Sequence, residues 1–145
     1  MLLKHLTIKT KKTDLTKAIK WYESIIIDYN IDKKAIIVFN ELLLNAYEHG
    51  NLQIKEKNKL IEKGEYEKIL LEKEKLCNKN IDIYLYKIGE YFITKICDEG
   101  EGFKNINFNT KKYSGRGLLM AKKFSNGLFY NEKGNVVCFF ICNKN

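Results

Sequence analysis

The sequence contains no proline and only one arginine, and no apolar run is long enough to cross a bilayer. Its N-terminal residues lack the apolar core of a secretory signal peptide, so we expect a cytoplasmic protein that does not bind membranes. No C-x-x-C pair occurs and only two histidines are present, which leaves a zinc site with little support. We interpret the four cysteines as reduced, mostly buried apolar residues.

The net charge of +8 is large enough to suggest a nucleic-acid partner, but the excess is scattered along the chain. Residues 55–75 hold seven lysines against six glutamates, whereas residues 1–20 hold six lysines against a single aspartate. We interpret the N-terminal excess as a solvated basic edge, with contact to an acidic partner as the alternative. We do not expect nucleic-acid binding.

No linker, repeat or low-complexity tract divides the chain, so residues 1–145 are expected to form one domain. Apolar spacing near 3.6 predicts two helices that follow Asp14 and Asp32, each capped by its aspartate, and that end near residues 29 and 48. Over residues 55–77, apolar residues recur at helical spacing and alternate with Glu and Lys. This pattern predicts a helical insertion at about 52–79, broken in two by Gly64.

Alternating apolar residues predict five strands. They are expected at residues 5–10, in a pair over residues 81–97 that turns at Gly89, and in a final hairpin over residues 127–142. A further helix is expected to end near Phe124. Because helices gather before and between mostly antiparallel strands, we predict an α+β fold, a two-layer sandwich with helices on one face of the sheet.

The helix expected over residues 33–48 is apolar nearly all round and should therefore be buried. Glu41 and Asn45 nevertheless lie four residues apart on one face, and Glu48 and His49 continue that edge. A buried carboxylate costs several kcal/mol unless it is paired or used. Since a solvated helix edge has the same spacing, this pattern alone does not decide between a site and a wet edge.

Two glycine-containing segments are also candidates for a site. Asp98, Gly100 and Gly102 directly follow an apolar strand, where a carboxylate can accept a hydrogen bond from an adenine amine and glycines let a flat base approach. Gly115 and Gly117 flank Arg116 at the start of a helix, where free N–H groups and a guanidinium suit phosphate. For the first segment the alternative is an ordinary glycine-rich turn. For the second it is an arginine that lies on the surface by chance. The polar residues 103–114 form a candidate lid.

Together, residues 40–50, 98–103 and 115–120 resemble, in order, the three ATP-binding boxes of the GHKL superfamily. The resemblance is strongest to bacterial anti-sigma-factor serine kinases, covers about residues 5–142, and implies the Bergerat fold of histidine-kinase-like ATPase domains. In two respects the sequence departs from the family. Gly134-Asn135 stands where Gly-Thr is usual, which puts adenine contacts there in doubt, and the insertion is longer than in the smallest of these kinases.

The resemblance implies a role for each predicted site residue. Asn45 would hold the Mg²⁺ that bridges the phosphates of ATP, Glu41 would act as the general base or orient the attacking group, and Asp98 would bind the adenine amine. The other nucleotide-binding residues would be His49, Gly100, Gly102, Gly115, Arg116 and Gly117.

The function expected from this resemblance is ATP-dependent phosphorylation of a serine or threonine on a small regulatory partner. That partner would be an anti-anti-sigma-like regulator in bacterial signalling, with a sigma factor as a further binding partner and a homodimer compatible with the family. The alternative is a non-catalytic module that binds partners in an ATP-dependent way. A histidine kinase is disfavoured because neither His5 nor His49 lies on a dimerisation helix.

Overall fold

The computed structural model describes residues 1–102 and 113–143, and only the backbone of residues 113–116. Its elements run in the order β1 (Leu2–Lys9), α1 (Lys12–Asp28), α2 (Lys34–Asn45), the π-helix η1 (Ala46–Asn51), α3 (Lys57–Glu62), α4 (Tyr66–Leu76), β2 (Asn80–Ile88), β3 (Tyr91–Cys97), α5 (Tyr113–Phe124), β4 (Gly127–Tyr130) and β5 (Val136–Cys142).

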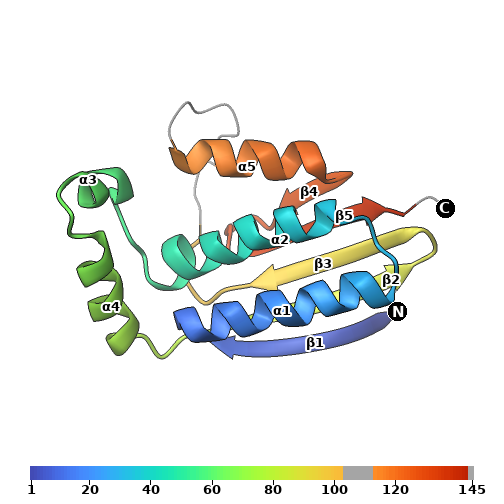
Figure 1. The fold of residues 1–145 in the computed structure, drawn as a ribbon, viewed down its shortest axis with the longest axis horizontal. Helices are drawn as coiled ribbons and strands as arrows, with labels where there is room; N and C mark the ends of the chain where they lie inside the picture. The colour runs from blue at the N-terminus through green and yellow to red at the C-terminus, as the bar shows by residue number, and fades with distance from the viewer. Residues whose placement is uncertain (103–112, 144–145) are drawn as a thin grey trace.

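The strands form one sheet in the order β1-β2-β3-β5-β4, and all neighbouring strands are antiparallel. Helices α1, α2 and α5 lie on one face of this sheet (Figure 1). Strand alternation directs apolar side chains toward them; Ile83 of β2, for example, is fully buried and pairs with buried Ile96 of β3. The predicted α+β class is confirmed, and the arrangement is compatible with two layers.

Tyr22 on α1 contacts both helix α2 and the central strand β3. Its ring stacks on Phe39 of α2 with 3.8 Å between centroids, and its hydroxyl hydrogen-bonds Thr94 of β3 at 2.7 Å. All three side chains are fully buried. Burial raises the pKa of Tyr22 well above its ordinary value, so the phenol stays neutral and bonded to Thr94. Helix α2 is thereby held at a fixed height above β3.

The predicted caps of the first two helices have different outcomes. Helix α1 begins at Lys12, before Asp14, and the Asp14 carboxylate accepts a hydrogen bond from the Lys9 backbone N–H at 2.9 Å. The prediction that Asp14 caps this helix is therefore wrong, because the chain turns two residues earlier. At the start of α2 the N-cap position is Lys33, whose side chain makes no capping bond, and Asp32, one residue earlier, accepts a hydrogen bond from the Lys34 N–H at 3.0 Å.

Helix α2 does not continue as a regular α-helix to Glu48, as its apolar spacing predicts. From Ala46 the chain widens into the π-helix η1. At its end the Leu52 N–H donates a hydrogen bond to the carbonyl of Tyr47, five residues earlier, at 3.0 Å. Short π-helical segments of this kind occur often at functional sites. The widened turn carries Glu48, Gly50 and Asn51, which recur below.

The insertion forms two helices separated by Gly64, whose φ of +69° suits glycine, so the predicted break is confirmed. Helices α3 and α4 lie beyond the end of α2 (Figure 1). Leu70 on α4 is fully buried, and Tyr47 of η1 donates a hydrogen bond to Glu74. The structure packs α4 against the domain itself.

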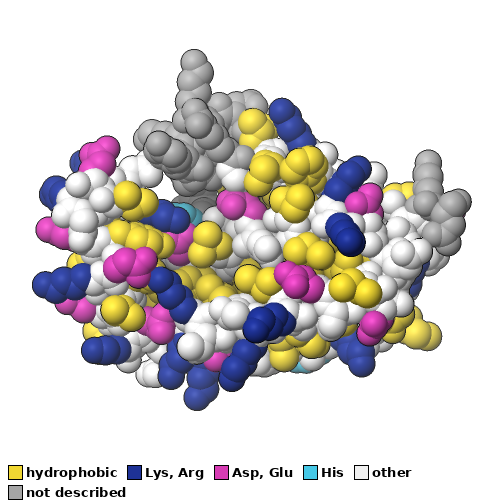
Figure 2. All heavy atoms as spheres, in the orientation of Figure 1, with side chains coloured by type: hydrophobic (Ala, Val, Ile, Leu, Met, Phe, Trp, Pro, Cys, Tyr) yellow, Lys and Arg dark blue, Asp and Glu magenta, His cyan; other side chains and the backbone are white. Residues whose placement is uncertain are grey.

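The exterior agrees with the scattered charge of the sequence. Acidic and basic side chains are interspersed over α3 and α4 (Figure 2). The four cysteines are free, and they are half-buried rather than mostly buried as expected. Within the described ranges, no helix combines the length and apolar character that a membrane span needs.

Candidate functional site

Glu41 on α2 faces α5 at the position of Gly117. A β-carbon at Gly117 would lie 1.7 Å from Glu41 Oε1 and 2.2 Å from its Cδ, so the carboxylate occupies the space that glycine leaves open. The first and third predicted segments are thus in contact. Helix α5 begins at Tyr113, so Gly115 and Arg116 lie inside its first turn instead of preceding it, and the Arg116 side chain is outside the described residues.

The half-buried Glu41 carboxyl has a raised pKa, and burial is the largest cause. The ammonium group of Lys57 opposes this shift, the negative charge of Glu48 adds to it, and the neighbouring Asn45 amide opposes it. The pKa of Glu41 therefore depends on residues from both α2 and the insertion. A carboxylate with a raised pKa accepts protons more readily than one in water, which suits a general base.

Asn45 is only 6% exposed and lies close enough to influence Glu41. Its Nδ2 atom is buried, yet no described residue accepts a hydrogen bond from it with ordinary geometry, and Asn40 Oδ1 likewise lacks a donor there. Leaving a buried polar group unsatisfied costs about 1–3 kcal/mol. An unpaired N–H donor at this place suits an anionic oxygen such as one on a phosphate group, whereas the predicted contact to a cation would use the other atom of the amide, Oδ1.

Asp98 lies at the end of β3 and is 9% exposed. Burial raises its pKa to about 6, although the Gly100 N–H donates to Oδ1 at 2.8 Å and the charges of Lys79 and Lys133 act in the opposite direction. The carboxylate is therefore ionised at neutral pH. It is a hydrogen-bond acceptor that is largely removed from solvent, and such an acceptor can receive a hydrogen bond from an amine.

Gly50 of η1 and Gly100 surround Asp98 without side chains. A β-carbon on Gly50 would lie 2.5 Å from Asp98 Cγ, and one on Gly100 would lie 2.0 Å from the Gly50 carbonyl oxygen. The end of the buried helix and the loop after β3 thus touch through their backbones. Gly50 is the last residue of the first predicted segment, and the sequence alone assigns it no role.

Asn51 fixes the loop after β3 to the rest of the domain. Its Oδ1 accepts a hydrogen bond from the Glu99 N–H at 2.8 Å, and its Nδ2 donates to Thr10 Oγ1 at 2.8 Å and to the Asn80 carbonyl at 2.9 Å. Asn51 and Thr10 are both buried. One amide therefore joins η1, the end of β1, the start of β2 and the loop that carries Asp98.

The turn between β4 and β5 closes the other side of this loop. Gly102, with φ of +88°, lies so close to Lys133 that a β-carbon would be 1.9 Å from the Lys133 carbonyl oxygen. The Asp98 N–H donates to the Asn135 carbonyl at 2.9 Å, and Asn135 Nδ2 donates to the Asp98 carbonyl at 3.4 Å. Asn135, the residue that departs from the family pattern, is therefore a direct neighbour of Asp98.

Tyr130 on β4 connects the two carboxylates. Burial raises the pKa of its hydroxyl, and the negative charges of Asp98 and then Glu41 raise it further. Gly50 contacts Asp98 and Glu41 contacts Gly117, so the first segment touches both of the others. The three predicted segments thus come together, and Tyr130 is a member that no sequence pattern indicated.

His49 Nδ1 lies 3.3 Å from the Ile54 carbonyl oxygen, which directs the ring toward the chain that leads into the insertion. Residues 103–112 of the predicted lid are outside the described residues, and residues 113–114 begin α5.

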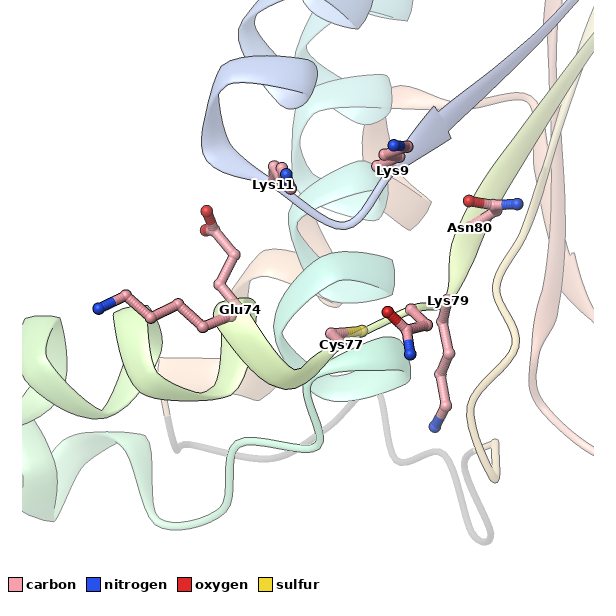
Figure 3. A pocket seen from close by; sticks show the side chains of 8 residues that line it. Lys9, Lys11, Glu74, Cys77, Lys79 and Asn80 are labelled. Carbon is pink, nitrogen blue, oxygen red and sulfur yellow. The ribbon is translucent and has the colours of Figure 1, made fainter.

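A surface pocket of about 560 Å³ lies beside this site and contains none of the predicted site residues (Figure 3). Its walls come from the β1–α1 junction, the end of α4 and the start of β2, with the lining residues Lys9, Lys11, Glu74, Lys75, Cys77, Asn78, Lys79 and Asn80. Lys79 extends away from Lys9 and Lys11 (Figure 3). The ammonium groups do not converge, so we assign the chemistry to the Glu41–Asp98 region.

No protein-family model and no curated protein matches this chain. Within the part of the chain that the structure describes, no three His, Cys, Asp or Glu side chains cluster to hold a metal. The chemistry available is thus one half-buried carboxylate, one buried acceptor carboxylate, a buried amide with an unpaired N–H donor, and three glycines that let other groups pack closely.

Proposed function

We propose that this chain binds Mg-ATP in a Bergerat-type site and transfers the γ-phosphoryl group to a serine or threonine of a small regulatory protein. The main support is that Gly117 lies against Glu41 and Gly50 lies against Asp98, so that contacts join three segments that are far apart in the sequence and resemble GHKL boxes. A fold that brought these segments together by chance would have no reason to keep glycine where a side chain would displace each carboxylate.

Asp98 would bind the adenine amine, because its carboxylate is ionised at neutral pH and is held by Gly100. Gly50 and Gly100 would let the backbones of η1 and of the loop after β3 lie close to Asp98. Asn45 would hold Mg²⁺ through its side-chain oxygen, with phosphates and waters completing the shell. Bound Mg²⁺ would supply neutralisation of the charge on the phosphates.

Glu41 would act on the incoming hydroxyl group. Its carboxylate accepts the hydroxyl proton as the oxygen bonds to the γ-phosphorus and the bond to the bridging oxygen breaks, which releases ADP. Gly117 allows the carboxylate to lie directly against α5, where the phosphates are expected at the start of the helix. Partner specificity and a sigma-factor complex would follow from surfaces outside these residues.

The proposal is tested by calorimetric titration of ATP and ADP with and without Mg²⁺, followed by transfer of labelled phosphate to candidate regulatory proteins. We expect Asp98→Asn to weaken nucleotide binding by at least about tenfold, because a charged hydrogen bond contributes about 1.5–3 kcal/mol. Glu41→Gln should retain binding and lose transfer. Glu101→Gln, in the same loop but exposed, is the matched control.

Each outcome separates the candidates. Tight nucleotide binding without transfer to any regulator would favour the non-catalytic binding module. Failure of the wild-type protein to bind any adenine nucleotide would refute both functions.

A further inference from the structure

Positive charge gathers at the surface pocket between the β1–α1 junction, the end of α4 and the start of β2, which the proposed function does not use (Figure 3). Its lining contains four lysines and one glutamate. The carboxylate of that glutamate, Glu74, is already engaged, because its Oε2 accepts hydrogen bonds from the Tyr47 hydroxyl and from the Lys12 backbone N–H. The pocket therefore carries a net positive charge.

Three lysines of this pocket have no ionic partner in the described parts of the chain. No carboxylate there forms an ion pair with Lys9, Lys11 or Lys75, and all three residues are exposed. By contrast Lys12, which follows directly in the sequence but does not line the pocket, pairs with Glu67 at 2.9 Å. A local excess of positive charge over a concave surface attracts anions.

The walls of the pocket are held in place by buried hydrogen bonds. Thr10, which is 1% exposed, donates from its hydroxyl to the Lys79 carbonyl at 2.6 Å. Asn51, which is 4% exposed, donates to Thr10 at 2.8 Å and to the Asn80 carbonyl at 2.9 Å. The β1–α1 junction and the start of β2 thus keep their relative position without a ligand. A pre-formed site loses less conformational entropy on binding than one that has to be ordered.

The arrangement of the ammonium groups favours an extended ligand over a compact ion. Lys79 extends away from Lys9 and Lys11, so the charges do not meet at one point (Figure 3). A single phosphate group would therefore contact only part of them. The pocket volume of about 560 Å³ leaves room for several chemical groups. A ligand with several separated negative charges can place one beside each lysine.

The uncharged lining residues favour a peptide over a nucleic acid. Asn78 and Asn80 each carry an amide, which both donates and accepts hydrogen bonds, and Glu74 adds an acceptor. A peptide backbone brings N–H donors as well as carbonyl acceptors, whereas phosphate groups bring acceptors alone. Sites for single-stranded nucleic acid also use aromatic rings for base stacking, and none of the described lining residues is aromatic.

We propose that this pocket binds an acidic peptide segment of a protein partner, with Lys9, Lys11 and Lys75 as the contacts for its carboxylates. The amides of Asn78 and Asn80 would bind the peptide backbone between these contacts. The helical insertion is a necessary part of the site, because α4 supplies one of its walls. Binding needs neither ATP nor Mg²⁺, so this proposal goes beyond the proposed function and does not rest on it.

The proposal is tested by fluorescence anisotropy with a labelled hexaglutamate peptide and the full, nucleotide-free chain. We expect Lys11→Gln with Lys75→Gln to weaken binding by about threefold or more, because two ion pairs at exposed positions are lost. Lys17→Gln with Lys20→Gln is the matched control, since it removes the same charge from exposed positions of α1 outside the pocket. It should change the affinity by less than about 1.5-fold, because distant charges are screened. Equal weakening by both double variants would overturn the proposal.

A second measurement uses the wild-type chain and so does not depend on any substitution. The side-chain amides of Asn78 and Asn80 are observed by NMR while hexaglutamate is added. Both signals should shift, whereas the signal of Asn143, whose amide donates to the Asn30 carbonyl at 2.9 Å, should stay in place. The absence of a shift at Asn78 and Asn80 would refute the peptide site.

A single-stranded oligonucleotide of equal charge decides between the two classes of ligand. It should bind more weakly than hexaglutamate. Tighter binding of the oligonucleotide that Lys11→Gln with Lys75→Gln weakens would assign the pocket to nucleic acid and overturn the proposal. Because these measurements contain no ATP, their failure leaves the proposed function standing, and a failure to bind ATP leaves the peptide site standing.

Discussion

Gly100→Ala adds one methyl group at the point where the loop after β3 touches η1. The new β-carbon would lie 2.0 Å from the carbonyl oxygen of Gly50, whereas ordinary contact begins at 3.4 Å, so the two segments must separate by about 1.4 Å. Both sides of this contact are backbone, so no side-chain rotation relieves it. The hydrogen bond from the Glu99 N–H to Asn51 opposes the separation.

Overpacking of this kind costs about 1–3 kcal/mol. For a chain of this size each kcal/mol lowers Tm by about 2–4 °C, so we expect a fall of roughly 3–10 °C. Thermal unfolding followed by circular dichroism measures it. Asp98 accepts a hydrogen bond from the Gly100 N–H, so its pKa should change as well.

Gly117→Ala is the matched control because it adds the same methyl group to a contact of another kind. Its β-carbon meets only the end of the flexible Glu41 side chain, which can rotate away. Alanine also favours the helix by up to about 1 kcal/mol. We therefore expect a Tm within about 3 °C of the wild type. If Gly100→Ala melts no lower than Gly117→Ala, the backbone contact between Gly50 and Gly100 is wrong.

Three further predictions follow from buried polar groups. Asn51→Ala should lower the free energy of unfolding in urea by about 2–4 kcal/mol, because three hydrogen bonds are lost, whereas exposed Asn78→Ala should change it by less than about 0.5 kcal/mol. Nucleotide affinity, measured by calorimetry, should be constant above pH 7 and fall about tenfold per unit below pH 6, because protonation of Asp98, with its pKa of about 6, competes with binding. Tyr22→Phe should lower the free energy of unfolding by about 1–2 kcal/mol, because it leaves the Thr94 hydroxyl unpaired. The double variant Tyr22→Phe with Thr94→Val should recover most of this loss. Equal stability of the single and the double variant would refute the hydrogen bond.

Much of the fold could be predicted from the sequence because strand alternation is a local signal. The final hairpin has the predicted bounds, and β3 begins and ends at the predicted residues, Tyr91 and Cys97. The widening of α2 into η1 could not be predicted, because apolar spacing near 3.6 does not reveal one extra residue in a turn. The predicted capping role of Asp14 is wrong because the carboxylate accepts its hydrogen bond from the Lys9 N–H, which belongs to β1 and not to the helix.

The candidate site was predictable where chemistry is concentrated in short segments. Glu41, Asp98 and Gly117 each stand in a segment with an unusual residue pattern, and the fold brings those segments together. Tyr130 and Lys57 carry no such pattern: one is an aromatic residue on a short strand, and the other is one of seven lysines in residues 55–75. Their contribution depends on contacts across the fold, which spacing along the chain does not contain.

The direct contact of Gly50 with Gly100 makes the end of the buried helix and the loop after β3 a single mechanical unit. Movement of the loop on ligand binding has to carry η1 with it, and η1 bears the carboxylate that holds Lys57. A displacement of this loop would in this way reach the insertion through the Gly50–Gly100 backbone contact and the ion pair of Glu48 with Lys57.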